Sequence, residues 1–546
     1  MRSRLLSAVT VVCLAQLSVG NGGAQTPAAS ASAAASKLKQ VAYIKASNTH
    51  ANDHFGNGGA LEGHGLALSG DGNTMAVGAP YESSAAKGVN GNQNDTSLYA
   101  SGAVYVFVRA NNAWSQQAYI KASNPKQSAR FGHVVSLSRD GNTLAVSAVF
   151  ESSAAKGVHA DANDGDQNDS SIPQAGAVYV FTRSGAAWSQ QAYIKASNTG
   201  EKEARNQPSK GDQFGFSLAL SADGNNLAVG AISEDSAAKG INGDQNDNSL
   251  PSSGAAYVFT RSGTKWSQQA YVKASNPGTM DLFGYAVGLS ADGSTLAVSA
   301  YDEGSSAREI NGVMDRGRRG SGAIYVFTRS GATPAQQTWA QTAYLKASNA
   351  ENQDSLGYDM AISLDGNTIA GGAGDEDCFA AGINPAEKCD NDYKTDTSTG
   401  AAYVFVRNGG TWTQQAFIKA SHPGKEDWFG SRLGLSGDGN TLGVGAQLEN
   451  GNSKGINGNE TNRTAEDSGV LYLFERTGTT WVQKAYVKGS NTEAYDEFGG
   501  SMAFSADGKT MAVGARSEGS AAKGVNGNQD DNSAMGAGAV YVFTNP

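Results

Sequence analysis

Three polar segments of this chain repeat asparagine and aspartate side chains at a spacing that could bind a metal ion. They carry Asn90, Asn92, Asn94 and Asp95; Asn242, Asp244, Asn246 and Asp247; and Asn526, Asn528, Asp530 and Asp531. Oxygen side chains at i, i+2, i+4 and i+5 around a glycine are typical of calcium-binding loops. Asn, Asp and Gly also form tight Asx turns without a metal. We favour Asx turns, because related segments at 311–316 and 457–461 lose or weaken the pattern. Ca2+ is the one cofactor kept as an alternative.

A second candidate site is a group of four arginines in one polar segment, Arg308, Arg316, Arg318 and Arg319. The chain has a formal net charge of -10, so this group is a local basic patch on an acidic molecule. Guanidinium groups bind carboxylates and sulfates well, which makes an acidic or sulfated ligand possible here. A solvated loop is the simpler interpretation.

No motif in the sequence indicates an enzyme. There is no His-Glu-x-x-His pair, no Gly-x-Ser-x-Gly nucleophile motif and no phosphate-binding glycine motif. His50, His54 and His64 share one segment, but we do not expect a metal site there. Catalysis needs acid and base groups that converge on one point, and the sequence shows no irregular His, Tyr and Glu cluster. We therefore expect a non-enzymatic protein.

Cysteine usage and charge narrow the class of protein further. Cys378 and Cys389 lie in one loop, and in an exported chain they predict a disulfide. Two free thiols or half of a metal site are the alternatives. The chain has 51 acidic and 41 basic residues, whereas a nucleic-acid-binding protein normally has a basic face. Nucleic acid is therefore excluded as an expected partner.

The first 24 residues are typical of a secretory signal peptide. Arg2 and Arg4 precede an apolar run from Leu5 to Val19, and small residues follow. The run is short for a membrane span, so a retained anchor is the weaker alternative. Residues 25–37 form an Ala/Ser-rich linker. We expect a mature chain without a transmembrane segment that is secreted, periplasmic or on the cell surface.

The rest of the chain, residues 38–546, is a repeat with a period of about 70 to 80 residues. Each copy contains two alternating apolar runs joined by an Asp-Gly pair, a strong signal for a tight β-hairpin. These pairs begin at Asp71, Asp140, Asp223, Asp292, Asp365, Asp438 and Asp507. Two further apolar runs complete four short strands per copy, which predicts an all-β fold, a β-propeller with seven four-stranded antiparallel blades.

The two ends of the chain predict how the ring closes. The last copy ends after the strand around Tyr541, without the fourth strand that the other copies have. A matching strand occurs instead near the start, around Tyr43. We therefore expect the N-terminal strand to complete the seventh blade.

The paired motifs of the repeat resemble a known family. Phe55-Gly56 followed by Gly78-Ala79-Pro80 is similar to the FG-GAP repeat of integrin α-subunit propellers and their bacterial relatives. Five other blades repeat the Phe-Gly pair, and one has Leu356-Gly357. The resemblance implies a propeller, and it also implies Asp-x-Asp-x-Asp-Gly calcium loops between the first two strands. The turns here carry one aspartate each, so those calcium sites are not transferred to this chain.

Long polar segments follow the second strands and join consecutive blades, so topology places them on one face of the propeller. Long loops on a rigid scaffold often carry function. We expect a monomeric, non-enzymatic scaffold for adhesion or protein interaction, with an extracellular protein or glycan as its partner. A lectin-like glycan-binding propeller is the alternative, and a polysaccharide lyase or hydrolase is less favoured. Six tryptophans at the fourth strands are expected to pack rather than to stack on sugars: Trp114, Trp188, Trp266, Trp339, Trp412 and Trp481.

Overall fold

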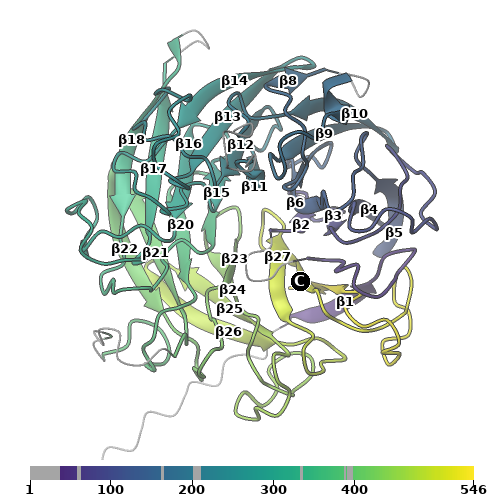
Figure 1. Cartoon of the computed structure of the whole chain (residues 1–546). Coiled ribbons are helices and arrows are strands. Elements are labelled where there is room, and N and C mark those ends of the chain that lie inside the picture. Colours follow the sequence, from purple (N-terminus) through teal and green to yellow (C-terminus); the bar gives the residue numbers. More distant parts are fainter. Residues whose placement is uncertain are drawn as a thin grey trace, which may run out of the picture. The chain divides into compact units, whose positions relative to one another are not determined.

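The computed structural model of the chain describes residues 37–57, 63–160, 165–200, 211–331, 336–386, 389 and 397–545. The predicted signal peptide and nearly all of the predicted linker lie outside the described residues. The part of the chain from Lys37 onward is an all-β propeller with seven sheets arranged as blades around an axis, as predicted (Figure 1). No helix among the described residues is long and apolar enough for a membrane span.

Each blade orders its strands from the axis outward, and blades are numbered here from the one that contains β2. The innermost strands are β2 (Leu66–Leu68), β6 (Phe131–Leu137), β11 (Phe214–Leu220), β15 (Val287–Leu289), β19 (Met360–Ile362), β23 (Arg432–Leu435) and β27 (Phe498–Phe504). The second strands are β3 (Thr74–Ala79), β7 (Thr143–Ala148), β12 (Asn226–Ala231), β16 (Thr295–Ala300), β20 (Thr368–Ala373), β24 (Thr441–Ala446) and β28 (Thr510–Ala515).

The two outer positions of each blade are filled in the same regular way. The third strands are β4 (Ala103–Ala110), β9 (Ala177–Ser184), β13 (Ala255–Ser262), β17 (Ala323–Ser330), β21 (Ala401–Asn408), β25 (Val470–Thr477) and β29 (Ala539–Thr544). The outermost strands are β5 (Ala113–Ile120), β10 (Ala187–Ile194), β14 (Lys265–Val272), β18 (Thr338–Leu345), β22 (Thr411–Ile418), β26 (Thr480–Val487) and β1 (Lys39–Ile44). Blade 2 adds a short edge strand, β8 (Val158–His159), and a 3-10 turn, η1 (Gly165–Asn168).

The N-terminal strand closes the ring, as predicted. Strand β1 pairs antiparallel with β29, placing Tyr43 opposite Tyr541 and Lys39 opposite Thr544. Figure 1 shows the purple β1 beside the yellow strands of the last blade. The two chain ends of the propeller therefore share one blade.

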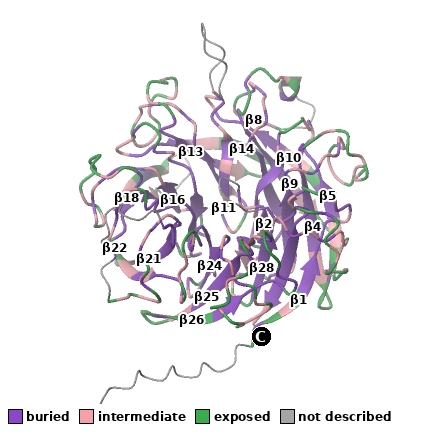
Figure 2. Cartoon of the chain, turned by 60° about the horizontal axis from the view of Figure 1, so that its bottom comes forward, coloured by how far each residue is buried: buried purple, intermediate pink, exposed green. Residues whose placement is uncertain are grey.

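Antiparallel strands alternate in direction, so the connections fall into two sets on opposite faces. The Asp-Gly turns and the hairpins between third and outermost strands form what we call the tight-turn face. The loops between second and third strands, together with the blade-to-blade links, form the long-loop face. Buried residues fill the strands, while exposed residues gather in the loops (Figure 2).

The Asp-Gly turns are held by their own side chains. In blade 1, Asp71 Oδ1 accepts hydrogen bonds from Ser69 Oγ at 2.5 Å and Asn73 N at 2.9 Å, and Oδ2 accepts one from Asn73 Nδ2 at 3.0 Å. The serine contact recurs in all seven turns. These aspartates therefore have the contacts of an Asx turn.

A closed circle of backbone hydrogen bonds joins these turns around the axis. Each bond runs from an N–H of one blade to a carbonyl of the next, with lengths of 2.7–3.0 Å. The circle passes through Gly70, Arg139, Ala222, Ala291, Leu364, Gly437 and Ala506 and returns to Gly70. The tight-turn face is thus tied together at its centre, independently of the closing strand β1.

The paired glycine motifs let neighbouring blades approach closely. A Cβ added to Gly78 of blade 1 would lie 2.0 Å from the carbonyl oxygen of Gly132 in blade 2. Gly132 itself has φ +89°, a value that disfavours other residues. The hydrophobic core therefore lies between blades: one cluster, for example, joins Ala228 and Val258 of blade 3 to Phe283 and Val298 of blade 4.

Candidate functional site

The bases of the long loops are fixed by a buried ion pair. In blade 1, Glu82 follows β3 and Lys121 follows β5, and Lys121 Nζ donates to Glu82 Oε2 at 2.6 Å and to Ser101 Oγ at 2.8 Å. Tyr119 donates its hydroxyl hydrogen to Glu82 Oε1 at 2.9 Å. The side chains of Lys121 and Glu82 are 0% and 1% exposed. Burial lowers the pKa of Lys121, and the charge of Glu82 opposes that shift.

All seven blades contain this ion pair, which we call the loop-base pair. Its members are Lys121–Glu82, Lys195–Glu151, Lys273–Glu234, Lys346–Glu303, Lys419–Glu376, Lys488–Glu449 and Lys45–Glu518. The lysine side chain is 0% exposed in every case. A buried charge needs such a partner, so each pair fixes a long loop against an outermost strand.

The blade-to-blade links are tied into the same pairs. Asn48, in the link from β1 to β2, donates to Glu82 Oε1 at 3.3 Å and accepts a short hydrogen bond from the Tyr105 hydroxyl. Equivalent Tyr–Asn contacts occur in five other blades, at Tyr179, Tyr257, Tyr325, Tyr403 and Tyr541. Both kinds of connection on the long-loop face therefore converge on buried polar groups.

A second buried carboxylate lies near the loop-base pair in six blades. These residues are Asp53, Asp212, Asp281, Asp354, Asp427 and Asp496, each at most 6% exposed. Arg316 pairs with Asp281 and Arg463 pairs with Asp427, which adds a cation in blades 4 and 6. Blade 2 has Ala129 at this position, and Lys126 joins Glu151 instead. The buried charge balance thus differs from blade to blade.

Stability is expected to fall as pH rises from about 4 to about 7. Burial raises the pKa of Asp53 and of Asp496 to about 7, whereas an unfolded aspartate titrates near 3.9. In this window the folded chain keeps protons that the unfolded chain has released. The free energy of unfolding therefore decreases with rising pH.

Asp53→Asn is expected to weaken this dependence. At pH 8 the substitution removes a buried charge and should add at most about 4 kcal/mol to the free energy of unfolding, while at pH 4 it should change little. Urea midpoints at both pH values measure the effect. Asp71→Asn is the control. Partial burial of Asp71 is outweighed by hydrogen bonds from Ser69 and Asn73, so its pKa is lowered, outside the window. Equal pH dependence in Asp53→Asn and the parent protein would refute the assignment.

Two cavities lie on the long-loop face at equivalent blade junctions. The cavity between blades 1 and 2 measures about 380 Å³ and is lined by residues that include Tyr81, Tyr99 and Arg130. The cavity between blades 4 and 5 measures about 420 Å³, with Asp302, Arg319, Asp375 and Asp377 among its lining residues. Each is formed by two long loops and the link between their blades. The cavities occupy the same place in the fold but differ in charge.

A third cavity, of about 160 Å³, lies at the beginning of the innermost strands. There His64 Nε2 is 2.8 Å from Asp359 Oδ1, and Asp359 Oδ2 accepts the N–H of Leu433 at 2.7 Å. Asp359 is buried, whereas the His64 side chain is 34% exposed. The guanidinium of Arg432 lies 5.9 Å from the ring centre of Tyr358. Blades 1, 5 and 6 thus bring acid, base and aromatic groups together at the axis.

Residue variation inside the repeat could have indicated this axial group. The residue after each Phe-Gly or Leu-Gly pair changes from blade to blade: Asn57, His133, Phe216, Tyr285, Tyr358, Ser431 and Gly500. Phe216 and Tyr285 are in contact, with ring centres 5.0 Å apart, and Tyr285 also contacts Tyr358 at 5.4 Å. The expectation that the chain has no irregular His, Tyr and Glu cluster was incomplete, because His64, Tyr285, Tyr358 and Asp359 line one axial cavity, with no glutamate among its lining residues.

A comparison with protein-family models identifies the repeat in this chain. The FG-GAP repeat model matches residues 114–181, 266–327 and 481–543. Each match runs from an outermost strand to the third strand of the next blade and includes a Phe-Gly pair. This chain contains FG-GAP repeats. No curated protein matches it.

The FG-GAP propeller is also similar to solved structures at low sequence identity. One is the periplasmic gluconolactonase PpgL of Pseudomonas aeruginosa, at 13% identity and TM-score 0.42, with 79% of this chain and 86% of that chain covered. Another is the WD40 repeat domain of RRP9, at 8% identity and TM-score 0.43, with 92% of this chain and 99% of that chain covered.

The predicted calcium residues of the FG-GAP propeller are engaged in local hydrogen bonds. Asn90 Oδ1 accepts the N–H of Tyr119 at 3.0 Å, Asn92 Oδ1 accepts that of Asn94 at 3.1 Å, and Asp95 Oδ2 accepts that of Ala85 at 2.7 Å. Blades 3 and 7 repeat the first two contacts at Asn242, Asp244, Asn526 and Asn528, while Asp247 and Asp531 each accept the N–H of the residue two positions later. These contacts are those of Asx turns and of a loop paired with the outermost strand. Calcium binding stays a prediction.

The four predicted ligand-binding arginines make different contacts, and their role in ligand binding stays a prediction. Arg316 makes a two-bond contact with Asp281, at 2.5 and 2.9 Å. Arg308 and Arg318 donate to the carbonyl of Ala350, and Arg319 lines the cavity between blades 4 and 5. Arg316 goes to Asp281 because two acidic side chains, Asp281 and Glu303, are buried there.

The tryptophans of the outermost strands pack, as predicted. Trp188 is 5% exposed, donates to Gln117 Oε1 of the preceding blade at 3.0 Å, and lies 5.3 Å from the guanidinium of Arg183. All six are at most 6% exposed. They are therefore not available for stacking on a sugar.

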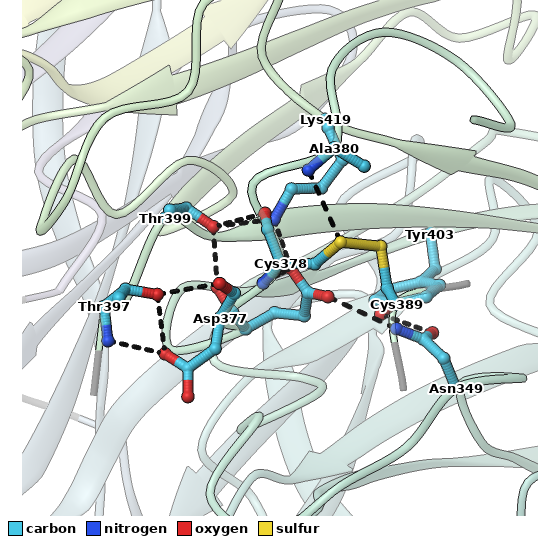
Figure 3. The surroundings of a disulfide bond; sticks show 10 residues. Asn349, Asp377, Cys378, Ala380, Cys389, Thr397, Thr399, Tyr403 and Lys419 are labelled. Carbon is cyan, nitrogen blue, oxygen red and sulfur yellow. Dashed lines mark hydrogen bonds and ion pairs between the residues drawn. A yellow bond between two sulfur atoms is a disulfide. The ribbon is translucent and has the colours of Figure 1, made fainter. Parts of the chain in front are cut away.

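The predicted disulfide is present. Cys378 and Cys389 are bonded, with Cα atoms 5.3 Å apart, in the long loop of blade 5. Figure 3 shows the bond close to Thr399 and Lys419, which hydrogen-bond to each other at 2.8 Å. Glu376, Cys378 and Cys389 are the only three His, Cys, Asp or Glu residues in the described part of the chain that gather closely enough to hold a metal. Two of them are joined as a disulfide.

Proposed function

We propose that this FG-GAP propeller is a monomeric, non-enzymatic binding scaffold, exported to the periplasm, the cell surface or the medium. Its ligand is an extracellular protein in an adhesion or interaction role, held on the long-loop face. The main support is that two cavities of similar size lie at equivalent junctions of that face. The loop-base pairs hold the loops around these cavities in place, which lowers the entropy cost of binding.

An array of extracellular matrix proteins and glycans tests the proposal. The parent protein should bind a subset of spots, and replacing Tyr99, Phe379 and Tyr495 on the long-loop face by serine should weaken that binding at least tenfold. Lys509→Ser, on the tight-turn face, is the control and should bind like the parent. Equal loss in both variants would contradict the assignment of the face. Binding that is unchanged by a chelator would count against functional calcium.

Glycan binding is the second candidate, and exposed aromatic side chains favour it. Tyr99, Phe379 and Tyr495 are 61%, 53% and 54% exposed, and all lie in loops or links of the long-loop face. An exposed aromatic ring offers an apolar face with a polar edge, which suits a sugar. Retention on protein spots alone would rule out this candidate.

The axial His64–Asp359 pair is where a polysaccharide lyase or hydrolase reaction would take place. For a non-enzymatic scaffold we expect no new reducing ends and no unsaturated products when the protein is incubated with polysaccharides. Product formation that is abolished in His64→Ala would overturn the non-enzymatic part of the proposal.

A further inference from the structure

We propose that the cavity between blades 1 and 2 binds a carboxylate-bearing sugar, such as a uronic acid unit of an acidic polysaccharide. This inference rests on the second candidate of the proposed function, glycan binding on the long-loop face, and names a ligand class for one site on that face. The carboxylate would be held by Arg130, whose guanidinium lies between two aromatic rings. It lies 4.5 Å from the ring centre of Tyr81 and 4.7 Å from that of Phe150.

The stacking of Arg130 leaves its hydrogen-bond donors available. Rings cover the faces of a stacked guanidinium, while its N–H groups point outward in its plane. No ion pair joins Arg130 to any carboxylate among the described residues, and no aspartate or glutamate lines the cavity. A planar carboxylate can accept two parallel hydrogen bonds from such a group. Arg130 is thus a positioned cation that forms no ion pair within the described part of the chain.

The other lining groups suit a sugar rather than an acidic peptide. Gln127, Ser128, Ser152 and Gln174 offer neutral donors and acceptors for hydroxyl groups. The ring of Tyr99, largely exposed at the cavity, can contact the apolar face of a pyranose. The volume of about 380 Å³ falls in the range of small-molecule sites.

The equivalent cavity between blades 4 and 5 lacks the stacked arginine, so a carboxylate site is expected only at the junction of blades 1 and 2 and not at this one. Ser355 occupies the position of Arg130, Asp302 that of Tyr81, and Asp375 that of Phe150. Ser355 donates to Asp375 at 2.9 Å, so this junction has no stacked cation and carries additional acidic groups. A carboxylate is expected to be repelled there, because like charges at close range are unfavourable.

Calorimetric titration with a trimer of galacturonic acid tests the inference. The trimer should bind the parent protein, and a neutral hexose trimer should bind at least tenfold more weakly. Arg130→Met keeps an unbranched apolar stem between the rings and should lower affinity for the acidic trimer at least tenfold. Arg130→Lys should restore only part of it, because a lysine lacks the planar pair of donors. Affinity should also fall as salt concentration rises.

Arg319→Met in the cavity between blades 4 and 5 is the matched control and should bind the trimer like the parent. Equal affinity for the acidic and neutral trimers would overturn the inference. An equal loss of affinity in Arg130→Met and Arg319→Met would overturn it as well. Tighter binding of a hexaglutamate peptide than of the trimer would assign the site to acidic peptides and also overturn it. If the array shows face-dependent binding but no variant alters trimer binding, the sugar site fails and the scaffold stands. Absence of any face-dependent binding on the array would instead defeat the proposed function.

Discussion

Replacing Lys273 by methionine lowers the free energy of unfolding by about 3–5 kcal/mol, the cost of leaving a buried charge without its partner. Lys273 Nζ donates to Glu234 Oε2 at 2.6 Å, and neither side chain is more than 1% exposed. Glu234 still accepts hydrogen bonds from Tyr271 and Asn198 in the variant. It loses the only cation that pairs with it among the described residues. Urea denaturation measures the shift.

Three comparisons make this prediction specific. Lys195→Met in blade 2 should cost clearly less, because Lys126 stays 2.9 Å from Glu151. Adding Glu234→Gln to Lys273→Met should recover part of the loss by removing the unpaired charge. Lys425→Met, at a surface pair with Glu426, should leave the denaturation curve unchanged. Similar losses for Lys273→Met and Lys195→Met would show that packing of the lysine stem, not its charge, is what matters.

Removing strand β1 should have an even larger effect. A variant that begins at Ser47 lacks Tyr43 and Ile44, both fully buried, and leaves Glu518 without Lys45. Burying two such side chains contributes about 1.5–3 kcal/mol each, and the unpaired Glu518 costs about 3–5 kcal/mol. The free energy of unfolding should therefore fall by at least about 6 kcal/mol.

A variant that begins at Lys37 keeps every described residue and is the control for this truncation. A synthetic peptide of residues 37–50, added to the variant that begins at Ser47, should raise its melting temperature in proportion to the logarithm of peptide concentration, because it binds only the folded ring. Identical melting of the two truncated variants would refute the role of β1 in closure. A peptide that carries Lys45→Met tests the two contributions separately. If it raises the melting temperature as well, strand pairing stabilises the ring without the ion pair.

The fold could be predicted from the sequence because its signals are local and repeated. An Asp-Gly pair between alternating runs specifies a hairpin whatever surrounds it, and seven copies leave no doubt about the number of blades. The last repeat lacks its fourth strand, and a matching strand occurs at the start of the propeller. Because a repeat is divided between the two ends only in a closed ring, this predicted the pairing of Tyr43 with Tyr541.

The functional groups were harder to predict, because they depend on contacts between distant residues. The repeat shows a lysine after each outermost strand and a glutamate after each second strand, but lysines are rarely buried, and these were not recognised as partners. His64 and Asp359 are 295 positions apart and meet only at the axis. Arg316 looked like part of a ligand site because sequence does not show that Asp281 is buried beside it. The sequence did not indicate Arg130 as a binding residue, because Tyr81 and Phe150, the two rings that it contacts, belong to two different blades.

The pairing of Lys39 with Thr544 also determines how the molecule would be presented on a support. The chain enters and leaves the propeller at the same edge, on the side of the Asp-Gly turns. A tether fixed at either end of the propeller would therefore be attached at its tight-turn face. The cavities between blades 1 and 2 and between blades 4 and 5 would then face outward, toward whatever the surroundings offer.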